Sequence, residues 1–417
     1  FNLGGCEGGF NYRHSKPRRT VLCPDTVRKY FRTTKPESLT DWYHGPVLSW
    51  FRRKRAFAKD RVFALDSTYI VVPENDRYQH TARLPLDEHR QFIDTSRLGA
   101  EEKSKLRYTP CYKLTYLLHL GEEPSSDPEP HRYFLIPAFR LGPGNADSHE
   151  HGRWIADTVT QAGGKGWMKW LIADRGFLDG AWIGELKRKH GTNLVIPLRK
   201  DMDAYHDVVG MARLGGDDVR WETVREERDD RGNVTVLERV TAFAEVRSWS
   251  GCPIPLYVGL IHKQWQTAAG EQKEDRWAIT SPEPFPSGRA LVDFYHRRSR
   301  IEEVNRALKQ PRRLDRFTSP EYSLVASHVA FTLLTYSLLQ FFLSAQGNWQ
   351  STHRFLRTLR HDTALGREAV VVYAKEVFGV FDQEEYTKIL LRLEDSARKR
   401  MLHGIEARQQ ERQAWAQ

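Results

Sequence analysis

The chain has 417 residues, of which 40% are hydrophobic and 28% charged. This composition is typical of a globular protein with one large domain or two to three ordinary ones, and it excludes intrinsic disorder, a collagen-like fibre and a small disulfide-stapled scaffold. Four cysteines lie far apart without a CxxC pair, which indicates neither a zinc cluster nor a disulfide framework. Residues 1–9 lack the basic and apolar regions of an export signal, so a reducing cytoplasm is the expected location.

The charge is unevenly distributed along the chain. A total of 64 Lys and Arg against 54 Asp and Glu gives a net charge of +10, which favours a polyanionic partner. Residues 1–61 hold 14 Lys and Arg against 5 Asp and Glu, and they include the run Arg52, Arg53, Lys54 and Arg55 among several aromatic residues. Residues 1–60 are therefore either a solvated basic face or a small, helical DNA-binding module.

The segment after this basic head predicts a mixed sheet. Strands are expected over residues 61–72, 112–120, 132–141, 167–173 and 193–198, and helices over residues 148–163 and 178–190. Three strands in succession, followed by alternating helix and strand, form the order of an α/β, ribonuclease-H-like sheet flanked by helices. Residues 61–199 are thus the first part of the expected catalytic domain.

The remainder of the chain divides into three further regions. Short alternating runs predict a β-rich insertion over residues 200–277. Residues 278–345 return to the catalytic domain with one helix over 291–310 and a second, apolar helix over 324–343. The second is long enough to span a bilayer, but its polar interruptions favour a helix buried against the sheet, so no membrane partner is expected. Residues 346–417 are expected to be a helical C-terminal region.

Two aspartates follow apolar strand residues. Asp66 comes after VFAL, and Asp174 comes after LIA and precedes a tight RGF turn. A carboxylate buried beside aliphatic side chains costs several kcal/mol unless it is paired or binds a metal. For either residue alone, structural hydrogen bonding explains the position as well as catalysis does.

A polar helix face is the third unusual feature. Tyr295, Arg298, Glu302 and Lys309 are separated by three, four and seven residues, which places them within an arc of roughly 60° on one helix. One interpretation is a surface ladder of ion pairs such as Arg298 with Glu302. Glu303 is a rival acid, but its Cβ points about 100° away from this face.

The same four residues carry a family resemblance. Their spacing is the YREK signature of bacterial insertion-sequence transposases of the IS-four family, within the DDE superfamily, and the chain resembles that family from about residue 61 to residue 345. LDST around Asp66, ADRGF around Asp174 and the β-rich insertion before Glu302 are also similar to it.

The resemblance implies a metal-dependent reaction on DNA. Asp66, Asp174 and Glu302 would be the catalytic ligands of two divalent cations, Mg²⁺ or Mn²⁺, since hard cations prefer carboxylate oxygens. Tyr295, Arg298 and Lys309 would grip phosphates at the transposon end, and Arg52, Arg53, Lys54 and Arg55 would add DNA contacts in the head. The partners would be double-stranded DNA, as transposon ends and as target, and a second copy of the chain in a homodimeric synaptic complex at the prokaryotic nucleoid.

The resemblance also implies a cut-and-paste reaction through a DNA hairpin. Trp277, near the end of the insertion, matches the position of a tryptophan that stacks on an extruded base, although a core tryptophan in a return strand is an equal alternative. Two rival functions use the same scaffold. One is a ribonuclease-H-like nuclease without strand transfer, and the other is a DNA-binding descendant of a transposase that has lost its chemistry.

Overall fold

The computed structural model contains two compact units. The large unit runs from Tyr30 to Trp349, and the small unit combines Phe1–Lys29 with Gln350–Gln417. The residues that the structure describes are 24–75, 77–87, 92–93, 95, 98–123, 131–216, 219–229, 232–267, 270–309, 314–345, 369–374, 377–382, 394–396 and 399.

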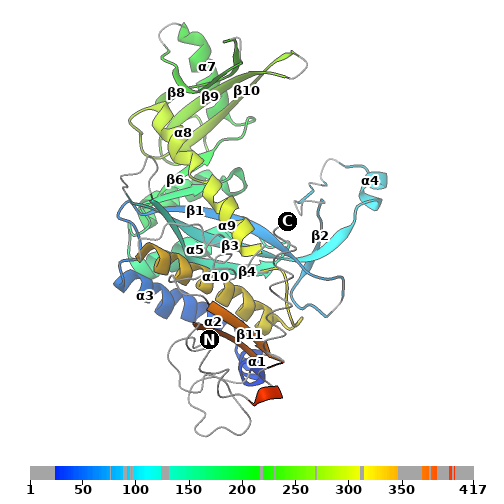
Figure 1. Ribbon diagram of the computed structural model, residues 1–417. Coiled ribbons are helices and arrows are strands. Elements are labelled where there is room, and N and C mark those ends of the chain that lie inside the picture. Colours follow the sequence, from blue (N-terminus) through cyan, green and yellow to red (C-terminus); the bar gives the residue numbers. More distant parts are fainter. Residues whose placement is uncertain are drawn as a thin grey trace. The chain divides into compact units, whose positions relative to one another are not determined.

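A mixed sheet forms the centre of the large unit (Figure 1). Its five core strands lie in the order β4-β3-β1-β5-β6, with a short β2 (Ala82–Pro85) beside the outer part of β3. β1 is antiparallel to β3 and parallel to β5, and β5 is parallel to β6, while β3 and β4 form a hairpin. The strand bounds are β1 Val62–Val71, β3 Tyr108–Glu123, β4 His131–Pro143, β5 Trp170–Ala173 and β6 Asn193–Pro197. This arrangement fits the predicted ribonuclease-H-like fold.

The strands of the predicted insertion continue this sheet. They are β7 (Glu222–Arg228), β8 (Val234–Val246), β9 (Leu256–Gln266) and β10 (Gln272–Ser281), paired antiparallel in sequence order. β10 also pairs with β6 through Ile279 and Thr280, which makes a sheet of ten strands. The predicted strands are therefore present, but they extend the central sheet. The segment also contains a helix, α7 (Asp203–Leu214), where we expected only β structure.

The two faces of the sheet are covered by different helices. α5 (Ser148–Gly163), which begins at the N-cap Asp147, covers one face together with α6 (Gly180–Glu185) and the π-helical turn η3 (Leu186–His190). The opposite face packs against α9 (Ser299–Lys309) and α10 (Tyr322–Ala345). Phe63 and Leu65 of β1 point to the first core, and Val62 and Ala64 to the second, because successive strand side chains alternate.

The outer strand β4 is closed by side chains rather than by another strand. Ser337 and Gln340 of α10 accept hydrogen bonds from the N–H groups of Ile136 and Phe134, at 2.9 and 3.0 Å. On the same strand, the His44 ring accepts from the N–H of Phe139 at 3.0 Å, and burial lowers the pKa of His44 to about 4, so the ring is neutral and can accept. These contacts satisfy an edge that would otherwise be open to aggregation.

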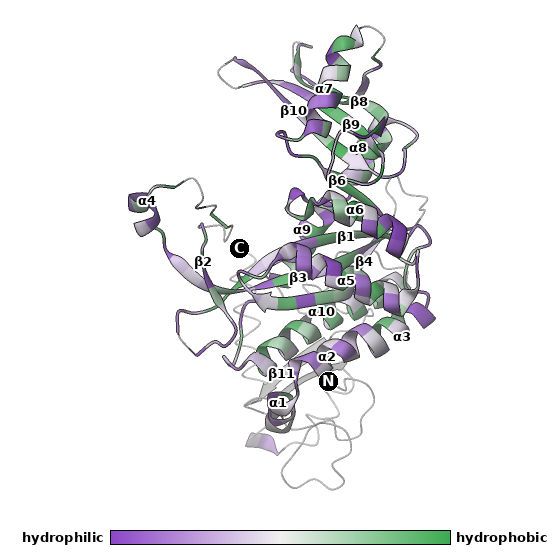
Figure 2. Cartoon of the chain, turned by 180° about the vertical axis from the view of Figure 1, so that it is seen from behind, coloured by the Kyte–Doolittle hydropathy of each residue, from purple (hydrophilic) through white to green (hydrophobic). Residues whose placement is uncertain are grey.

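α10 is long and apolar enough to cross a membrane by length and composition alone, as Figure 2 shows by its largely hydrophobic colour. Half of its most apolar window is buried inside the protein. Its polar residues Ser337 and Gln340 are the ones that bind β4, so the polar interruptions seen in the sequence have a structural role. The helix packs against the sheet, as predicted, although it is only partly buried.

The described part of the predicted head, residues 24–60, contains helices that pack on the sheet from Tyr30 onward. Residues 1–23 lie outside the described part of the chain. The remaining helices are α1 (Pro24–Thr33), α2 (Pro36–Trp42), the π-helical η1 (Tyr43–Val47) and α3 (Leu48–Arg53). Tyr43 and Phe51 are buried, and the Tyr43 hydroxyl donates to the carbonyl of Ile136 at 2.8 Å. From Tyr30 onward the head is packed into the same unit as the sheet, because its aromatic residues face the core.

The C-terminal region was expected to be helical, and that prediction is wrong where the structure describes strands. β11 (Ala369–Ala374) and β12 (Val377–Asp382) form an antiparallel hairpin. The sequence AVVVYA followed after two residues by VFGVFD is rich in β-branched and aromatic residues, which is a hairpin signal that we missed. Most of residues 346–417 lie outside the described residues.

Candidate active site

Asp66 and Asp174 lie side by side on neighbouring strands. β1 and β5 are parallel, and Leu65 is paired with Ala173, so the next residues along the two strands are the two aspartates. Ala64 and its partner Ile172 both face the core under α9 and α10. Because strand side chains alternate, Asp66 and Asp174 point to the same face. The two carboxylates that the sequence places 108 residues apart are thus brought together by the register.

The Asp66 carboxyl is in an unfavourable electrostatic environment. Burial, and then the charge of Asp174, raise its pKa to about 6, while Arg298 acts in the opposite direction. Asp66 accepts two hydrogen bonds, one from the N–H of Ser67 at 2.9 Å and one from the side-chain amide of Asn305 at 3.2 Å. Two hydrogen bonds and one arginine leave the pKa of this carboxyl above its ordinary value, so the site favours additional positive charge.

Asp174 is held by the turn that follows β5. It is the N-cap of the 3₁₀ turn η2 (Arg175–Phe177), and its Oδ1 accepts from the N–H of Gly176 at 2.8 Å. A Cβ at position 176 would lie 2.9 Å from that oxygen, so the glycine of the ADRG sequence leaves room for the carboxylate. The carboxylate is half-buried at the edge of the sheet. This is the accessible strand-to-helix turn that the sequence predicts.

The predicted continuous helix over residues 291–310 is interrupted. α8 (Gly288–His296) ends before Arg297, and α9 begins at Ser299. The break leaves Tyr295 and Arg298 on a tight turn, in which the N–H of Arg298 donates to the carbonyl of Tyr295 at 2.9 Å. The two side chains also hydrogen-bond to each other. The four YREK residues therefore do not share one helix, although Tyr295 and Arg298 remain in contact.

Arg298 lies among three carboxylates. Its Nη2 donates to Oε1 of Glu302 at 2.9 Å, and it interacts electrostatically with Asp66 and Asp174. The Arg298 side chain is 22% exposed and that of Glu302 is 60% exposed, so Glu302 lies on the solvent side of Arg298. The ligand atoms of Asp66, Asp174 and Glu302 do not all lie within 4.8 Å of one another. Glu303, the rival acid, instead pairs with Arg300 at 2.9 Å. Helix α9 contacts β1 directly, which places Glu302 on the helix that covers Asp66 (Figure 1).

Trp277 contacts Tyr295, and Lys309 lies at the end of α9. Trp277 lies in β10, is half-buried, and its ring centroid is 6.1 Å from that of Tyr295 at an interplanar angle of 58°. Lys309 is the last residue of α9 and is also half-buried. The tryptophan therefore contacts the YREK tyrosine and also packs against the core under β10.

Two residues of this site were missed by the sequence analysis. The Tyr116 hydroxyl, from β3, donates to Oδ1 of Asn305 at 2.9 Å, and the Asn305 amide donates to Asp66 at 3.2 Å. Tyr116 is the strand partner of Asp66 in the β1–β3 register. Asn305 lies seven residues after Arg298, two turns along α9, so a search of that helix face for any polar side chain would have found it.

A comparison with known protein families identifies the family to which this chain belongs. The family model described as the transposase DDE domain matches residues 57–338, which include both aspartates, the turn with Arg298, and Glu302. The chain belongs to the DDE transposase family. None of the curated proteins compared with the chain matches it. The family assignment establishes a transposase domain, an enzyme that acts on DNA, and a family that uses divalent metal ions.

The residues at this site fit a divalent cation. Asp66, Asp174 and Glu302 offer hard oxygen ligands, and a cation beside Asp66 would offset the burial and the repulsion from Asp174 that raise the pKa of its carboxyl. Arg298 supplies part of that charge, and its bond to Glu302 would have to open when a cation is bound.

A second cluster of potential ligands lies away from this site. Among the described residues, Asp157, Glu185 and His190 have ligand atoms within 4.8 Å of one another. Lys189 forms ion pairs with both acids, and Arg153 also pairs with Glu185. The negative charge of this cluster is thus already neutralised by cationic side chains of α5 and η3.

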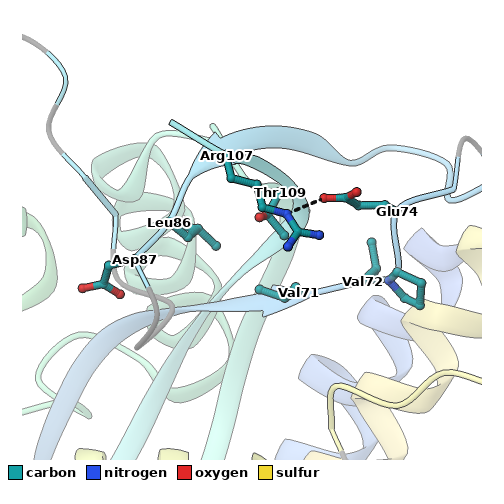
Figure 3. A pocket seen from close by; sticks show the side chains of 8 residues that line it. Val71, Val72, Glu74, Leu86, Asp87, Arg107 and Thr109 are labelled. Atoms are coloured by element: carbon teal, nitrogen blue, oxygen red, sulfur yellow. Dashed lines mark hydrogen bonds and ion pairs between the residues drawn. The ribbon is translucent and has the colours of Figure 1, made fainter. Parts of the chain in front are cut away.

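A pocket of about 480 Å³ lies beyond the end of β1, as Figure 3 shows. It is lined by residues of the β1 end and of the β2 and β3 segments, and the ion pair between Arg107 and Glu74, at 3.0 Å, lies on one side of it. This pair neutralises two of the three charged residues that line the pocket, the third being Asp87, and none of the predicted site residues lines it.

The residues of the predicted basic run, Arg52 to Arg55, differ in their contacts. Arg52 donates hydrogen bonds to the carbonyls of Ala162 and Gly163, at the C-terminal end of α5. Arg53, Lys54 and Arg55 are exposed. Arg52 therefore stabilises the helix end, where carbonyl groups have no partner inside the helix.

Proposed function

We propose that this protein cuts DNA at the inverted-repeat ends of an insertion sequence and joins those ends to target DNA. Asp66, Asp174 and Glu302 are the proposed metal ligands. The observation that carries the proposal is the pairing of Asp66 and Asp174 on adjacent parallel strands beneath Arg298 and Glu302. Two divalent cations at such carboxylates supply activation of the attacking oxygen and stabilisation of the leaving oxygen.

The protein's own side chains have three roles in this proposal. Asn305 and Ser67 orient the Asp66 carboxylate through hydrogen bonds, and Gly176 orients Asp174. Arg298 balances the three acids in the free protein and turns to a phosphate oxygen when DNA and cations are bound, since a guanidinium forks onto phosphate. Tyr295 and Lys309 hold neighbouring phosphates. These contacts position the DNA and do not read its sequence.

We further propose membership in the IS-four group and a cut-and-paste reaction with a hairpin intermediate. The YREK spacing supports the first proposal, and the contact between Trp277 and Tyr295 supports the second, because a half-buried indole beside the phosphate-binding tyrosine can stack on a displaced base. The expected assembly is a homodimer on paired ends, acting in the prokaryotic cytoplasm at the nucleoid.

The test is a cleavage assay on labelled DNA that carries the element's own ends, in Mg²⁺ or Mn²⁺, resolved on a denaturing gel. Wild type is compared with Glu302→Gln and with the matched control Glu303→Gln, whose acid pairs with Arg300. Nicked, hairpin and joined products that disappear only in Glu302→Gln support the proposal. Cleavage without joining would favour a nuclease, and end binding without cleavage would favour a DNA-binding descendant.

A further inference from the structure

A basic groove lies on the large unit outside the candidate active site. It has a volume of about 940 Å³ and is formed by two segments far apart in sequence, residues 49–61 and 163–167. No acid is among its lining residues. Its basic side chains are Arg52, Arg53, Arg55, Lys59, Arg61 and Lys165.

Two of these six arginines and lysines hold the walls together. Arg52 donates to the carbonyls of Ala162 and Gly163, and so ties α3 to the end of α5. The Arg61 guanidinium lies 5.7 Å from the centroid of the Trp167 ring and donates to the Trp167 carbonyl at 3.5 Å. The two walls of the groove are therefore held together by the contacts of Arg52 and Arg61.

The other four basic side chains are exposed and carry uncompensated charge. Within the described part of the chain, no Asp or Glu forms an ion pair with Arg53, Arg55, Lys59 or Lys165. Asp60 lies between two of the lining residues, but it pairs with Arg297 at 3.3 Å, on the turn that precedes Arg298. Four unpaired cations in one groove attract a polyanion.

The backbone of both walls adopts conformations that few residues favour. Arg55 and Arg61 have φ values of 54° and 52°, and such left-handed conformations are uncommon for bulky residues and persist only where the surrounding structure requires them. On the other wall, Gly164 and Gly166 have φ values of 88° and 77° and form the turn that presents Lys165. The GGKG sequence thus serves to place one lysine opposite the Arg53–Lys59 segment.

The groove is separate from the metal ligands. Arg61 directly precedes β1, so Asp66 is five residues further along the strand, roughly 16 Å away. Phe63 and Trp167, which pack beneath the groove, belong to the core on the α5 face, whereas Asp66 faces α9. The two aromatic residues that line the groove are held in the core, since Trp167 is only 6% exposed and the Phe57 ring packs against it with the centroids 5.0 Å apart.

We propose that this groove binds the sugar–phosphate backbone of double-stranded DNA at a distance from the reacting phosphodiester. The proposal rests on the proposed function, because DNA is the substrate of the family. Arg53, Arg55, Lys59 and Lys165 make the phosphate contacts, while Arg52 and Arg61 shape the groove. Binding through phosphates alone is independent of base sequence and strongly dependent on salt.

The test compares two triple variants of the full chain that lose the same charge. The groove variant is Arg53→Gln with Lys59→Gln and Lys165→Gln. The control is Lys103→Gln with Arg213→Gln and Arg220→Gln, all exposed and outside the groove. Fluorescence anisotropy of a labelled duplex is measured over roughly 50 to 200 mM salt in EDTA, which prevents cleavage, and circular dichroism confirms that both variants fold.

We expect the groove variant to bind about tenfold or more weakly at about 0.1 M salt, with the slope of log K against log salt reduced by about two to three, and the control to match wild type. Equal losses in both variants, or no duplex binding by wild type, would overturn the proposal. So would tighter binding of RNA or of anionic phosphatidylglycerol vesicles than of the duplex.

The outcome is independent of the cleavage assay. A wild type that binds duplex through the groove without cutting it would contradict the proposed function and leave the groove intact. A wild type that cuts and joins DNA, while the groove variant binds like wild type, would contradict the groove alone.

Discussion

The two groups of acids in this protein differ in how their charge is balanced. Asp157 and Glu185 lie beside His190 on the α5 side of the sheet, and Lys189 and Arg153 pair with them. Asp66 and Asp174 lie on the opposite face, where burial and mutual repulsion raise the pKa of Asp66 to about 6 despite Arg298. In the first group the potential ligand atoms lie close together, and Lys189 and Arg153 neutralise their charge. The second has a charge that the protein alone does not satisfy.

This difference shows that close spacing of ligand atoms is by itself a poor guide to a metal centre. Surface acids gather around lysines and arginines for small electrostatic gains, and such pairs contribute little. A site that binds a cation must instead keep its carboxylates available at a cost in stability, as functional sites commonly do. If Asp66 and Asp174 belong to the reactive centre, and Asp157 and Glu185 do not, substitutions in the two groups should have different effects.

The largest expected effect is on cleavage. Asp174→Asn or Glu302→Gln removes one proposed metal ligand, and we expect cleavage of element ends to fall by about 10³-fold or more because charge on the transferring phosphate is no longer balanced. Asp157→Asn, in the neutralised cluster, should change the rate by less than about twofold. Single-turnover cleavage in Mg²⁺ measures both. Equal losses in the two clusters would remove the distinction.

Arg298 should affect metal binding and cleavage in opposite directions. Arg298→Gln removes the positive charge that competes with a cation, so Mn²⁺ should bind several-fold more tightly. The same change removes the guanidinium that would bind a phosphate through two hydrogen bonds, so cleavage should fall by roughly 10- to 100-fold. Calorimetric Mn²⁺ titration measures the first effect, and cleavage rates measure the second. The control is Arg300→Gln, since Arg300 pairs with Glu303. Weaker metal binding would show that Arg298 does not act as a counter-charge.

Much of the site was predictable from sequence because its residues sit in short, rigid patterns. Asp66 and Asp174 follow apolar strands, and a parallel register brings them together. Two features were not predictable. The helix over residues 291–310 breaks at Arg297, because a turn there lets Arg297 pair with Asp60 and donate to the carbonyl of Leu120, contacts distant in sequence. The bonds of Asn305 to Asp66 and Tyr116 likewise depend on how α9 crosses the sheet.

The same limit applies to the fold. Most strands of the sheet were predicted because their β-branched runs are local signals, although the short β2 was missed. The joining of β10 to β6 depends on pairing between Ile279 and Pro197 that no local pattern encodes. The head was predicted to be a small, helical DNA-binding module or a solvated basic face because its charge is conspicuous. Its aromatic residues, Tyr43 and Phe51 among them, determine that it packs on the sheet.

A smaller effect is expected on stability. The folded-state pKa of Asp66 is above its ordinary value, so the folded protein binds more protons than the unfolded chain between about pH 4 and pH 6. The stability of the metal-free protein therefore decreases as the pH rises through this range. Asp66→Asn should stabilise the metal-free protein by about 1–3 kcal/mol at about pH 7.5 and have little effect at about pH 4.

Urea unfolding in EDTA at the two pH values measures this difference, with Asp157→Asn as the control that should show no gain at the higher pH. Added Mn²⁺ should reverse the order of wild type and Asp66→Asn, because only the wild type keeps both strand ligands. A destabilised Asp66→Asn protein at the higher pH would mean that the ionised carboxylate is already well satisfied by Asn305, Ser67 and Arg298.

The smallest effect concerns the chain from Tyr116 through Asn305 to Asp66. Asn305→Ala leaves the Tyr116 hydroxyl with only its longer contact to the Ile301 carbonyl, at 3.4 Å, and removes one donor from Asp66, so it should cost about 1–2 kcal/mol of stability. Tyr116→Phe should cost less once Asn305 is absent, with a coupling of about 0.5–1.5 kcal/mol in a double-mutant cycle. Because Asn305 orients the Asp66 ligand, Asn305→Ala should also weaken Mn²⁺ binding about tenfold. The control Arg306→Ala, at an exposed position of the same helix, should change neither the stability nor the Mn²⁺ affinity. A coupling near zero together with unchanged metal affinity would mean that α9 is positioned over β1 by its apolar residues alone, and that the asparagine only satisfies a buried tyrosine.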